Sequence, residues 1–516
     1  MSTTAVQKDP PVLGRRYLGT MAATCLAVFV AQYTNAMPGA LNGTFQQVFH
    51  AAGTQLQWIS AASMIPVVVF ELTFGVLGDL WGRKKLLFVG IGLAVLGSVV
   101  ITLAQTVQMM WAGQVIIGLG AGIMFPISLS LIAAVTPDLR TRARSIAIWA
   151  GCLSIGAAAS PLVAGFAAEH GHWRAAYVVA AVIAVIAMLL TFGVTESSAP
   201  EGRVLDIPGQ ITFALGLTLV LFAIVQGSEV GWAKPEIVTG FVAGAVLLAA
   251  FVVIELRAPV PLLRLSLFAN RSFAVAAVVA TVGMFGYLTY CFSMSIWISA
   301  AQRQNPLTIG ILMVFVQGPA LLLIPFVSYL IRKVAPQLVL TSGFVLMSAG
   351  AFLASRSDIN DMAWATFILP SVLVGIGFAF TIGSITAVAI NTVPLNYAGM
   401  ASATTNMFRD LGFALGPVLG GAIAFSASAN RFESSLATSH LPAPVVGAAQ
   451  HIPPLGAVNI PHFPAAGLAL NALGHGFSIA FVVASIAALA AAVVTLVGLQ
   501  GVARQTEDAF LQAEAA

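Results

Sequence analysis

The stretch that decides the fold is GVLGDLWGRKK, residues 75–85. It joins two long apolar segments, where a plain turn would need neither an acid nor a pattern of glycines. Gly75, Gly78 and Gly82 allow helix backbones to approach closely. Asp79 can interact with the N-terminus of a neighbouring helix or with an arginine in a loop. The order of glycines and acid therefore indicates a specific contact and not merely a hydrophilic turn.

Composition indicates that lipid surrounds most of the chain. Of its 516 residues, 59% are hydrophobic and 8% are charged, whereas soluble domains carry roughly 25% charged residues. About fourteen apolar runs reach the roughly 20 residues that cross a bilayer. These runs are approximately 18–41, 57–79, 86–106, 109–134, 144–168, 174–194, 209–227, 236–256, 272–300, 307–331, 337–355, 363–390, 399–427 and 474–500. The sequence thus predicts an all-α polytopic protein in the lipid bilayer.

The cations predict how the chain is oriented. Arg83, Lys84 and Lys85 share one loop, and most other cations fall in loops on the same side of the predicted spans. Because loop cations stay on the cytoplasmic side, we expect both ends, 1–17 and 501–516, in the cytoplasm. The expected location is the plasma (inner) membrane of a bacterium.

The sequence carries no signal for catalysis. It has no Gly-Lys-Ser/Thr phosphate loop, and the glycines at 118–122 lie inside an apolar run with no preceding strand. Cys25, Cys152 and Cys291 match no metal-ligand spacing, and we expect them to be small buried hydrophobes. The net charge of +4 is small. We therefore expect no enzyme, no cofactor or metal, and no nucleic-acid partner.

The two ends of the chain repeat each other. Gly-Leu-Gly at 118–120 and Gly-Ile-Gly at 375–377 are each followed by a proline at the same spacing. GAAASPLVAG at 156–165 similarly matches GFALGPVLGG at 412–421. Small residues allow tight helix crossings, and a proline removes a helix hydrogen bond. The expected helix-packing residues are Gly156, Pro161, Gly165, Gly412, Gly416, Pro417, Gly420 and Gly421.

The repeat predicts the domain organisation. The nearly constant offset indicates two homologous six-helix halves, 18–196 and 262–500, with an inserted pair of linker helices at 205–258. Repeated halves related by an axis along the membrane normal place a binding site between them near the midplane. The segment 428–472, rich in Pro, Ala, Ser and His, is expected to be a long external loop with little structure.

These motifs together resemble one known family. Residues 75–85 resemble the cytoplasmic signature loop of major facilitator transporters, and the paired Gly-Pro segments resemble a signature of drug antiporters. Asp206 and Glu255, with the residues around them, resemble the fourteen-span drug:proton antiporter branch. The resemblance covers about 18–500 and implies the major facilitator fold. It implies a latch between the halves, with the conformational gate residues Gly75, Gly78, Asp79, Gly82, Arg83 and Lys84.

At two positions this chain lacks the charged residues that the branch associates with proton coupling or cation recognition. The branch usually carries an acid where this chain has Gln32, and an arginine where it has Gln114. Glutamine cannot take part in proton transfer by titrating. Gln32, Asn35 and Gln114 are candidates for a polar cavity or, alternatively, for hydrogen bonds between helices. Tyr287 and Tyr290 are candidates for ligand contact or for packing.

Three charges remain inside the predicted spans, namely Glu71, Arg409 and Asp410. A charge at the bilayer centre costs about 2.5–3.5 kcal/mol, so each needs a partner or water. We hypothesise that Glu71 and Arg409 pair across the halves in the outward-facing state, and that protonation of Glu71 weakens the pair. Alternatively, Arg409 and Asp410 satisfy each other and Glu71 faces a water-filled cavity.

The sequence therefore predicts a secondary active transporter that works by alternating access. The expected activity is export of hydrophobic or amphipathic compounds by a monomer, with the proton gradient as energy source. The alternative is a dedicated metabolite or lipid carrier, either an importer or a weakly coupled facilitator. The residues Gln32 and Gln114 favour that alternative because neither can titrate.

Overall fold

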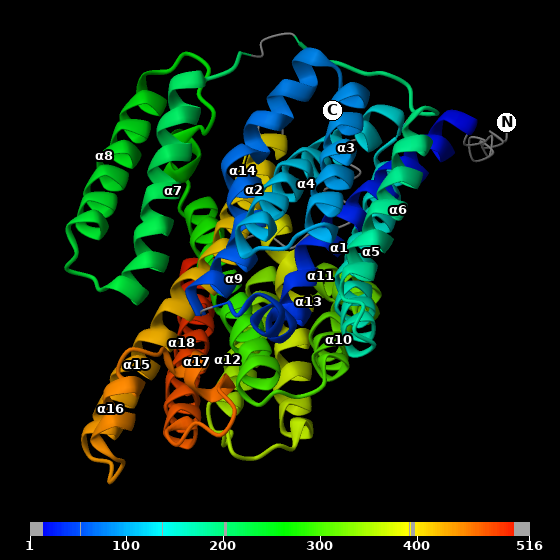
Figure 1. Ribbon diagram of the computed structural model, residues 1–516. Helices are drawn as coiled ribbons and strands as arrows, with labels where there is room; N and C mark the ends of the chain where they lie inside the picture. Colours follow the sequence, from blue (N-terminus) through cyan, green and yellow to red (C-terminus); the bar gives the residue numbers. More distant parts are fainter. Residues whose placement is uncertain are drawn as a thin grey trace, which may run out of the picture.

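The protein is a bundle of long helices (Figure 1), and the computed structural model describes residues 14–51, 53–136, 138–200, 204–391, 393 and 398–499. Of the expected cytoplasmic ends, 1–17 and 501–516, residues 1–13 and 501–516 lie outside this part. The first half consists of α1 (Arg15–Phe49), α2 (Gly53–Trp81), α3 (Arg83–Thr102), α4 (Val107–Val135), α5 (Leu139–Glu169) and α6 (Arg174–Thr191).

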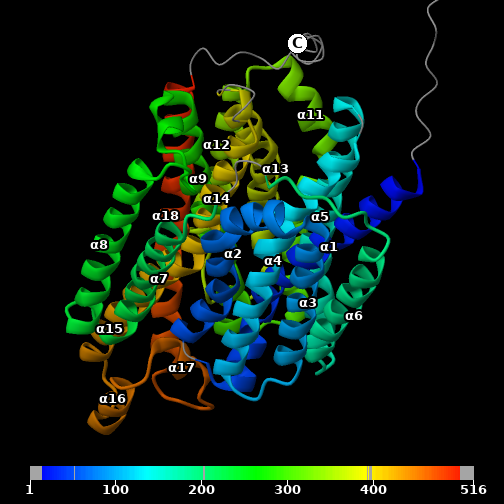
Figure 2. The same cartoon turned by 90° about the horizontal axis from the view of Figure 1, so that it is seen from above.

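Two helices, α7 (Ile207–Val230) and α8 (Pro235–Arg257), stand at one edge of the bundle in both views (Figures 1 and 2). They correspond to the linker pair that the sequence places between the halves. The side chain of Gln210 on α7 donates a hydrogen bond of 2.8 Å to the carbonyl of Val69. The pair is therefore attached to α2, the helix that carries the signature loop.

The second half follows the linker pair. Its elements are η1 (Leu265–Ala269), α9 (Arg271–Ser295), η2 (Ile296–Ala301), α10 (Pro306–Leu322), α11 (Ile324–Lys333), α12 (Pro336–Ala354), η3 (Trp364–Phe367), α13 (Ile368–Asn391), α14 (Ala398–Leu415), η5 (Gly416–Gly420), α15 (Gly421–Ala437), α16 (Ala443–Ala449), α17 (Pro454–Asn459) and α18 (Ala466–Gly498). The elements η2 and η5 are π-helical, and η5 joins α14 and α15 into one span.

The predicted number of spans is confirmed within the described residues. Thirteen helices are long and apolar enough to cross a membrane, and the number is fourteen if α10 and α11 form one span. These two helices are bent by 51° at their junction, next to Pro319 and Pro325. Proline removes a helix hydrogen bond and crowds the preceding turn, which accounts for the bend.

Equivalent glycines pack in the same way in each half. A Cβ added at Gly120 would lie 2.6 Å from the carbonyl oxygen of Gly90 on α3. A Cβ added at Gly377 would lie 2.4 Å from the carbonyl oxygen of Gly343 on α12. In both halves the fourth helix therefore rests directly on the backbone of the third, as the predicted repeat requires.

The expectation of a loosely structured segment at 428–472 is wrong. Its first ten residues continue α15, its last seven begin α18, and α16 and α17 lie between them. Apolar side chains of these helices form a small core of their own, and its fully or nearly buried members include Phe432, Leu436 and Ala457. The prolines that suggested a loop stand instead at the first turns of α16 and α17, where proline is tolerated.

Candidate functional site

The two halves meet along two crossing pairs of helices, α5 with α10 and α2 with α14–α15. At the first crossing the contact is reciprocal. A Cβ on Gly165 would lie 2.7 Å from the carbonyl oxygen of Pro306, and a Cβ on Gly310 would lie 2.6 Å from that of Pro161. Only residues without a side chain allow the backbones of the two halves to approach so closely.

The halves are also joined at the far end of the bundle, opposite residues 75–85. Asn42 on α1 donates a hydrogen bond of 3.0 Å to the hydroxyl of Ser295 on α9, and that hydroxyl donates to the carbonyl of Gly39. A Cβ on Gly43 would lie 2.7 Å from the carbonyl oxygen of Ser299 in η2. We call this contact of α1 with α9 and η2 the far-end seal.

At the signature-loop end, the described contacts of the loop cations stay within the first half. Arg83 forms an ion pair of 2.8 Å with Asp79 and donates to the carbonyl of Ser130 on α4. The backbone N–H of Lys84 donates to Glu196 at 2.9 Å, and its ammonium group donates to the carbonyl of Phe192 at 3.0 Å. The loop is thus organised by α4 and the end of α6.

The glycines of the signature loop have separate structural roles. Gly82 has a φ of 108°, a conformation that other residues rarely adopt, and it lies between α2 and α3. A Cβ on Gly78 would lie 2.1 Å from the side chain of Ile127 on α4, so Gly78 sets the spacing of α2 and α4. Gly75 has more room, because its nearest neighbour would be Pro126 at 3.8 Å.

The three charges predicted inside the spans come together where α2 crosses α14. Arg409 donates from Nε to Asp410 at 2.8 Å and from Nη1 to the side chain of Asn406 at 3.2 Å. Glu71 is 4% exposed and interacts electrostatically with both Asp410 and Arg409. We call Glu71, Asn406, Arg409 and Asp410 the inter-half charge cluster, because Glu71 belongs to one half and the others belong to the second.

The cluster only partly matches the two hypotheses from the sequence. Arg409 is paired with Asp410 in its own half, as the alternative expects, but Glu71 is buried against these residues and does not face water. One oxygen of Glu71 and one of Asp410 are buried without a hydrogen-bond partner among the residues that the structure describes. The Glu71–Arg409 pair was expected for a conformation that is open at the far end, so that hypothesis stays a prediction.

The described hydrogen bonds do not join the polar residues predicted on α1 to the one predicted on α4. Gln114 is fully buried and donates a hydrogen bond of 3.1 Å to the hydroxyl of Tyr177, so it joins α4 to α6 within one half. Asn35 is 8% exposed and its side-chain oxygen has no partner. Gln32 is half-buried. A role in a polar cavity stays a prediction for Gln32 and Asn35.

Both candidate tyrosines of α9 are buried by packing within the second half. The ring of Tyr287 stacks on that of Phe378, with centroids 4.2 Å apart, and lies near Phe413. Tyr290 shares a hydrogen bond of 2.9 Å with the hydroxyl of Ser371. Tyr290 is thus joined to α13 in this structure, whereas the hydroxyl of Tyr287 is buried without a hydrogen-bond partner among the described residues. Contact of either tyrosine with a ligand stays a prediction.

Sequence reasoning missed two polar residues at the junction of the halves. Gln57 on α2 is fully buried against Gly421, and neither its oxygen nor its nitrogen has a hydrogen-bond partner. Asn42 forms the far-end seal with Ser295. Asn42 follows the predicted run 18–41 and Gln57 begins the run 57–79, and neither position indicates which helix face meets the other half.

Comparison with known proteins identifies the family. The profile described as Major Facilitator Superfamily matches residues 24–417. The chain belongs to the major facilitator superfamily. Members of this family are transporters and not enzymes, as the sequence predicted. The protein is thus a multi-pass membrane transporter.

Curated relatives of this superfamily member are drug resistance and efflux proteins. Multidrug resistance protein Stp of Mycobacterium tuberculosis is 27% identical over 414 residues, which cover 80% of this chain and 77% of Stp. The tetracenomycin C resistance and export protein of Streptomyces glaucescens is 25% identical over 494 residues, covering 92% and 90%. The multidrug efflux pump LfrA of Mycolicibacterium smegmatis is 27% identical over 383 residues, covering 73% and 74%. These relatives agree with the branch that the sequence resembles.

Solved structures confirm the major facilitator fold. A POT family transporter in complex with 5-aminolevulinic acid superimposes with a TM-score of 0.63 at 12% identity, covering 92% of this chain and 95% of that chain. The inward open xylose transporter XylE from E. coli gives a TM-score of 0.58 at 13% identity, covering 97% and 99%. At such low identity these similarities concern the fold alone.

Proposed function

We propose that this transporter exports hydrophobic or amphipathic compounds across the plasma membrane and that the proton gradient drives it. Two observations support export. The relatives bear the names of multidrug and antibiotic resistance proteins. A buried apolar cluster also joins helices of both halves, among them α1, α9 and α10, and such side chains suit contact with apolar compounds.

The observation that carries proton coupling is the inter-half charge cluster. Glu71 and Asp410 are buried carboxyls from opposite halves, and each has one oxygen without a hydrogen-bond partner. A proton bound to either carboxyl would remove one negative charge and provide a hydrogen bond between the two groups. Proton binding at this place would therefore change the free energy of contact between α2 and α14.

The proposed cycle alternates access by rocking the two halves. The described far-end seal and the crossing of α5 with α10 hold the halves together at one end. Because loop cations favour the cytoplasmic side, we propose that the signature loop with Arg83 and Lys84 lies in the cytoplasm and that the sealed end faces outward. Opening this end would separate α1 from η2 and rearrange the α2–α14 crossing, where Glu71 would exchange Asp410 for Arg409.

The test is a dye-efflux assay in cells that express the protein, with and without a protonophore uncoupler. Glu71→Gln removes the titratable group while it keeps the shape of the side chain. A charge inside the bilayer is worth about 2.5 kcal/mol, so uncoupler-sensitive efflux should fall at least about tenfold. Normal uncoupler-sensitive efflux by Glu71→Gln would overturn the proposed coupling site.

A matched control is Glu255→Gln. Glu255 is a buried carboxyl on α8 that is not part of the inter-half charge cluster, and it accepts a hydrogen bond from the backbone of Leu263 that glutamine can also accept. Efflux by this variant should stay close to that of the unmodified protein. Equal losses in both variants would mean that removing any buried carboxyl impairs the protein.

The second candidate function is a dedicated carrier for one metabolite or lipid. It is favoured by Gln32 and Gln114, which stand where the fourteen-span drug:proton antiporter branch usually has charged residues. It is also favoured by the burial of Gln114, which is hydrogen-bonded to Tyr177. A screen of dyes and antibiotics with no change in accumulation, followed by uptake of a defined metabolite, would support this candidate over drug export.

A further inference from the structure

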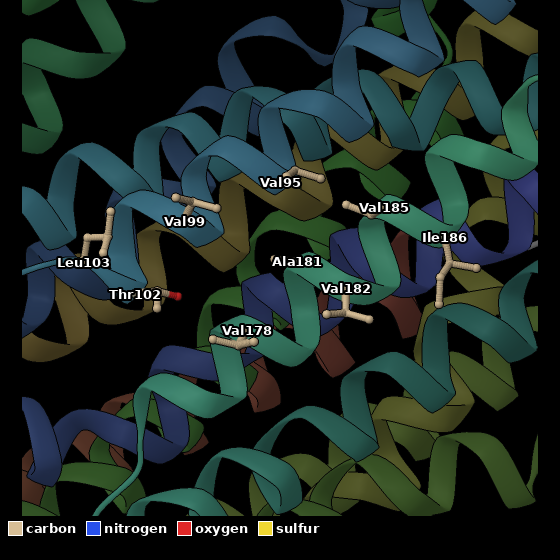
Figure 3. A pocket seen from close by; sticks show the side chains of 9 residues that line it. All are labelled: Val95, Val99, Thr102, Leu103, Val178, Ala181, Val182, Val185 and Ile186. Carbon is tan, nitrogen blue, oxygen red and sulfur yellow. The ribbon is translucent and has the colours of Figure 1, made fainter.

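An apolar groove of about 400 Å³ lies on the outside of the first half, between α3 and α6 (Figure 3). Its lining residues are Val95, Val99, Thr102 and Leu103 on α3 and Val178, Ala181, Val182, Val185 and Ile186 on α6. Val95 and Ala181 are half-buried, whereas Leu103 and Val182 are 65% and 54% exposed. The groove therefore has a recessed floor and faces the surrounding membrane.

The chemistry of the lining selects an apolar occupant. Eight of the nine lining side chains are hydrocarbon, and the ninth is Thr102. The hydroxyl of Thr102 donates a hydrogen bond of 2.8 Å to the carbonyl of Ser98 within its own helix. A polar ligand would lose its hydrogen bonds to water here and form none with the lining side chains, at a cost of about 1–3 kcal/mol for each polar group.

The dimensions of the groove match one leaflet of a bilayer. Its lining extends over eight residue steps from Val95 to Leu103, at the end of α3, and over eight from Val178 to Ile186 on α6. At 1.5 Å per residue, each wall is about 12 Å long. The hydrocarbon of one leaflet is about 15 Å thick, half of the roughly 30 Å core. A slot of this length along the membrane normal has the shape of a lipid acyl chain.

A cation stands at the open end of the groove. Arg174 precedes Val178 by one helical turn, and its Nη2 donates a hydrogen bond of 2.7 Å to the carbonyl of Ala104, next to Leu103. Its guanidinium lies 4.5 Å from the ring centroid of Trp173. These contacts hold the side chain in place and leave further N–H donors, which suit the oxygens of a phosphate group.

We propose that this groove is a binding site for an acidic phospholipid, with one acyl chain between α3 and α6 and the phosphate at Arg174. The aliphatic lining accounts for the chain, and the positive charge at the mouth accounts for the preference for a negatively charged headgroup. The lipid would come from the bilayer leaflet that surrounds the end of the bundle with the far-end seal. The site is separate from the transport pathway and does not depend on the proposed function.

Native mass spectrometry of the full-length protein in detergent tests the site. Dioleoyl phosphatidylglycerol and dioleoyl phosphatidylcholine, which share their acyl chains, are added in equal amounts and the bound lipid is counted. The unmodified protein should retain phosphatidylglycerol in preference. Arg174→Gln should remove this preference, a change of about tenfold in the ratio of the two lipids. The choline cation offsets the phosphate charge of phosphatidylcholine, so loss of the arginine charge weakens binding of the net-negative phosphatidylglycerol more. Ala181→Phe should reduce retention of both lipids by filling the floor.

Two control variants separate this site from general effects. Arg356 is an exposed arginine on the opposite half, 5.4 Å from the ring centroid of Phe352, so Arg356→Gln removes a similar cation elsewhere. Ala249→Phe adds a ring to an exposed position of α8. Both controls should retain lipid as the unmodified protein does. If Ala181→Phe fails to fold, Arg174→Gln alone still decides the question, since it leaves all nine lining side chains unchanged.

Three results would overturn the proposal. The first is equal retention of phosphatidylglycerol and phosphatidylcholine by the unmodified protein. The second is an unchanged preference in Arg174→Gln. The third is a dimer that dissociates in Ala181→Phe without any change in bound lipid, which would assign the groove to a second copy of this chain.

Discussion

The two copies of the Gly-Pro segment, one in α5 and one across α14–α15, pack alike against their own halves. A Cβ on Gly156 would lie 2.6 Å from the carbonyl oxygen of Phe29 on α1. A Cβ on Gly412 would lie 2.4 Å from the carbonyl oxygen of Thr281 on α9. In each half the fifth helix therefore rests on the backbone of the first, and the glycine makes this contact possible.

The copies differ in backbone regularity. The first passes Pro161 as an α-helix, whereas the second becomes π-helical over Gly416–Gly420. In the first copy, Ser160 donates a hydrogen bond of 2.6 Å to the carbonyl of Tyr33. In the second copy the hydroxyl is on the neighbouring helix, where Thr289 donates to the carbonyl of Gly416 at 3.3 Å.

This difference shows that one motif can serve two purposes. The first copy, with serine and alanine at two of the glycine positions, is a regular packing helix. The second has glycine at those positions, contains a π-helical segment, and carries Arg409 and Asp410 of the inter-half charge cluster less than two turns earlier. π-Helical segments are frequent at functional sites, and here the less regular copy is the one with charges.

The largest effect is expected from replacing the glycine that lets the fifth helix of each half rest on the backbone of the first. In Gly412→Val and in Gly156→Val, the new Cβ would meet a backbone oxygen that cannot move without shifting a helix. Each should lose at least about 2–3 kcal/mol of stability, so that little folded protein is recovered. The measurement is the yield of monodisperse protein by size-exclusion chromatography in detergent. Gly151→Val on α5 is the matched control because its Cβ would meet nothing within 4 Å, and poor folding of that control would contradict this reasoning.

A smaller effect is expected from the hydroxyl of the first copy. Ser160→Ala leaves the buried carbonyl of Tyr33 without its side-chain donor, which should cost about 1–2 kcal/mol. The midpoint of thermal unfolding in detergent should fall by about 1–2 °C, because the shift caused by a given loss becomes smaller as the protein becomes larger. Ser154→Ala removes a hydroxyl that is bonded within α5 itself and should change the midpoint much less. Equal shifts in the two variants would argue against a special role for Ser160.

The smallest effect is expected from the corresponding hydroxyl of the second copy. Thr289→Val keeps the shape of the side chain and removes a longer hydrogen bond, so the loss should be below about 1 kcal/mol. The same unfolding measurement applies, with Thr495→Val as control, since Thr495 is bonded within α18. A larger loss than that of Ser160→Ala would mean that the π-helical copy depends on its hydroxyl more than the regular copy does.

Much of the fold could be predicted because the length of an apolar run and the repetition of a motif can be recognised in the sequence itself. Runs of apolar residues mark the spans whatever they pack against, and the paired Gly-x-Gly and Gly-Pro segments are recognisable without knowing their partners. The bend between α10 and α11 was harder to predict, since proline also occurs inside α1, α2, α4 and α5, which continue past it. Neighbouring helices decide whether a proline breaks a span.

The candidate site was predicted less completely, because its geometry depends on pairs of residues far apart in the sequence. Glu71, Arg409 and Asp410 were identified as buried charges needing partners, but which of them would pair depends on the conformation. The burial of the cysteines was also predicted only in part, because it too depends on residues far apart in the sequence. Only Cys291 is buried as expected, whereas Cys25 and Cys152 are half-buried and interact with each other across α1 and α5.

The helices α16 and α17 offer a place for a fluorescent label that reports whether the far-end seal is open or closed. Arg303, just after η2, donates hydrogen bonds of 2.6 and 2.8 Å to the side chain and backbone of Asn459 at the end of α17. Any motion that lifts η2 from α1 must therefore displace this small helical unit or break those bonds. A fluorophore on α16, paired with one on the first half, would convert opening of the seal into a change in energy transfer that can be followed in single molecules.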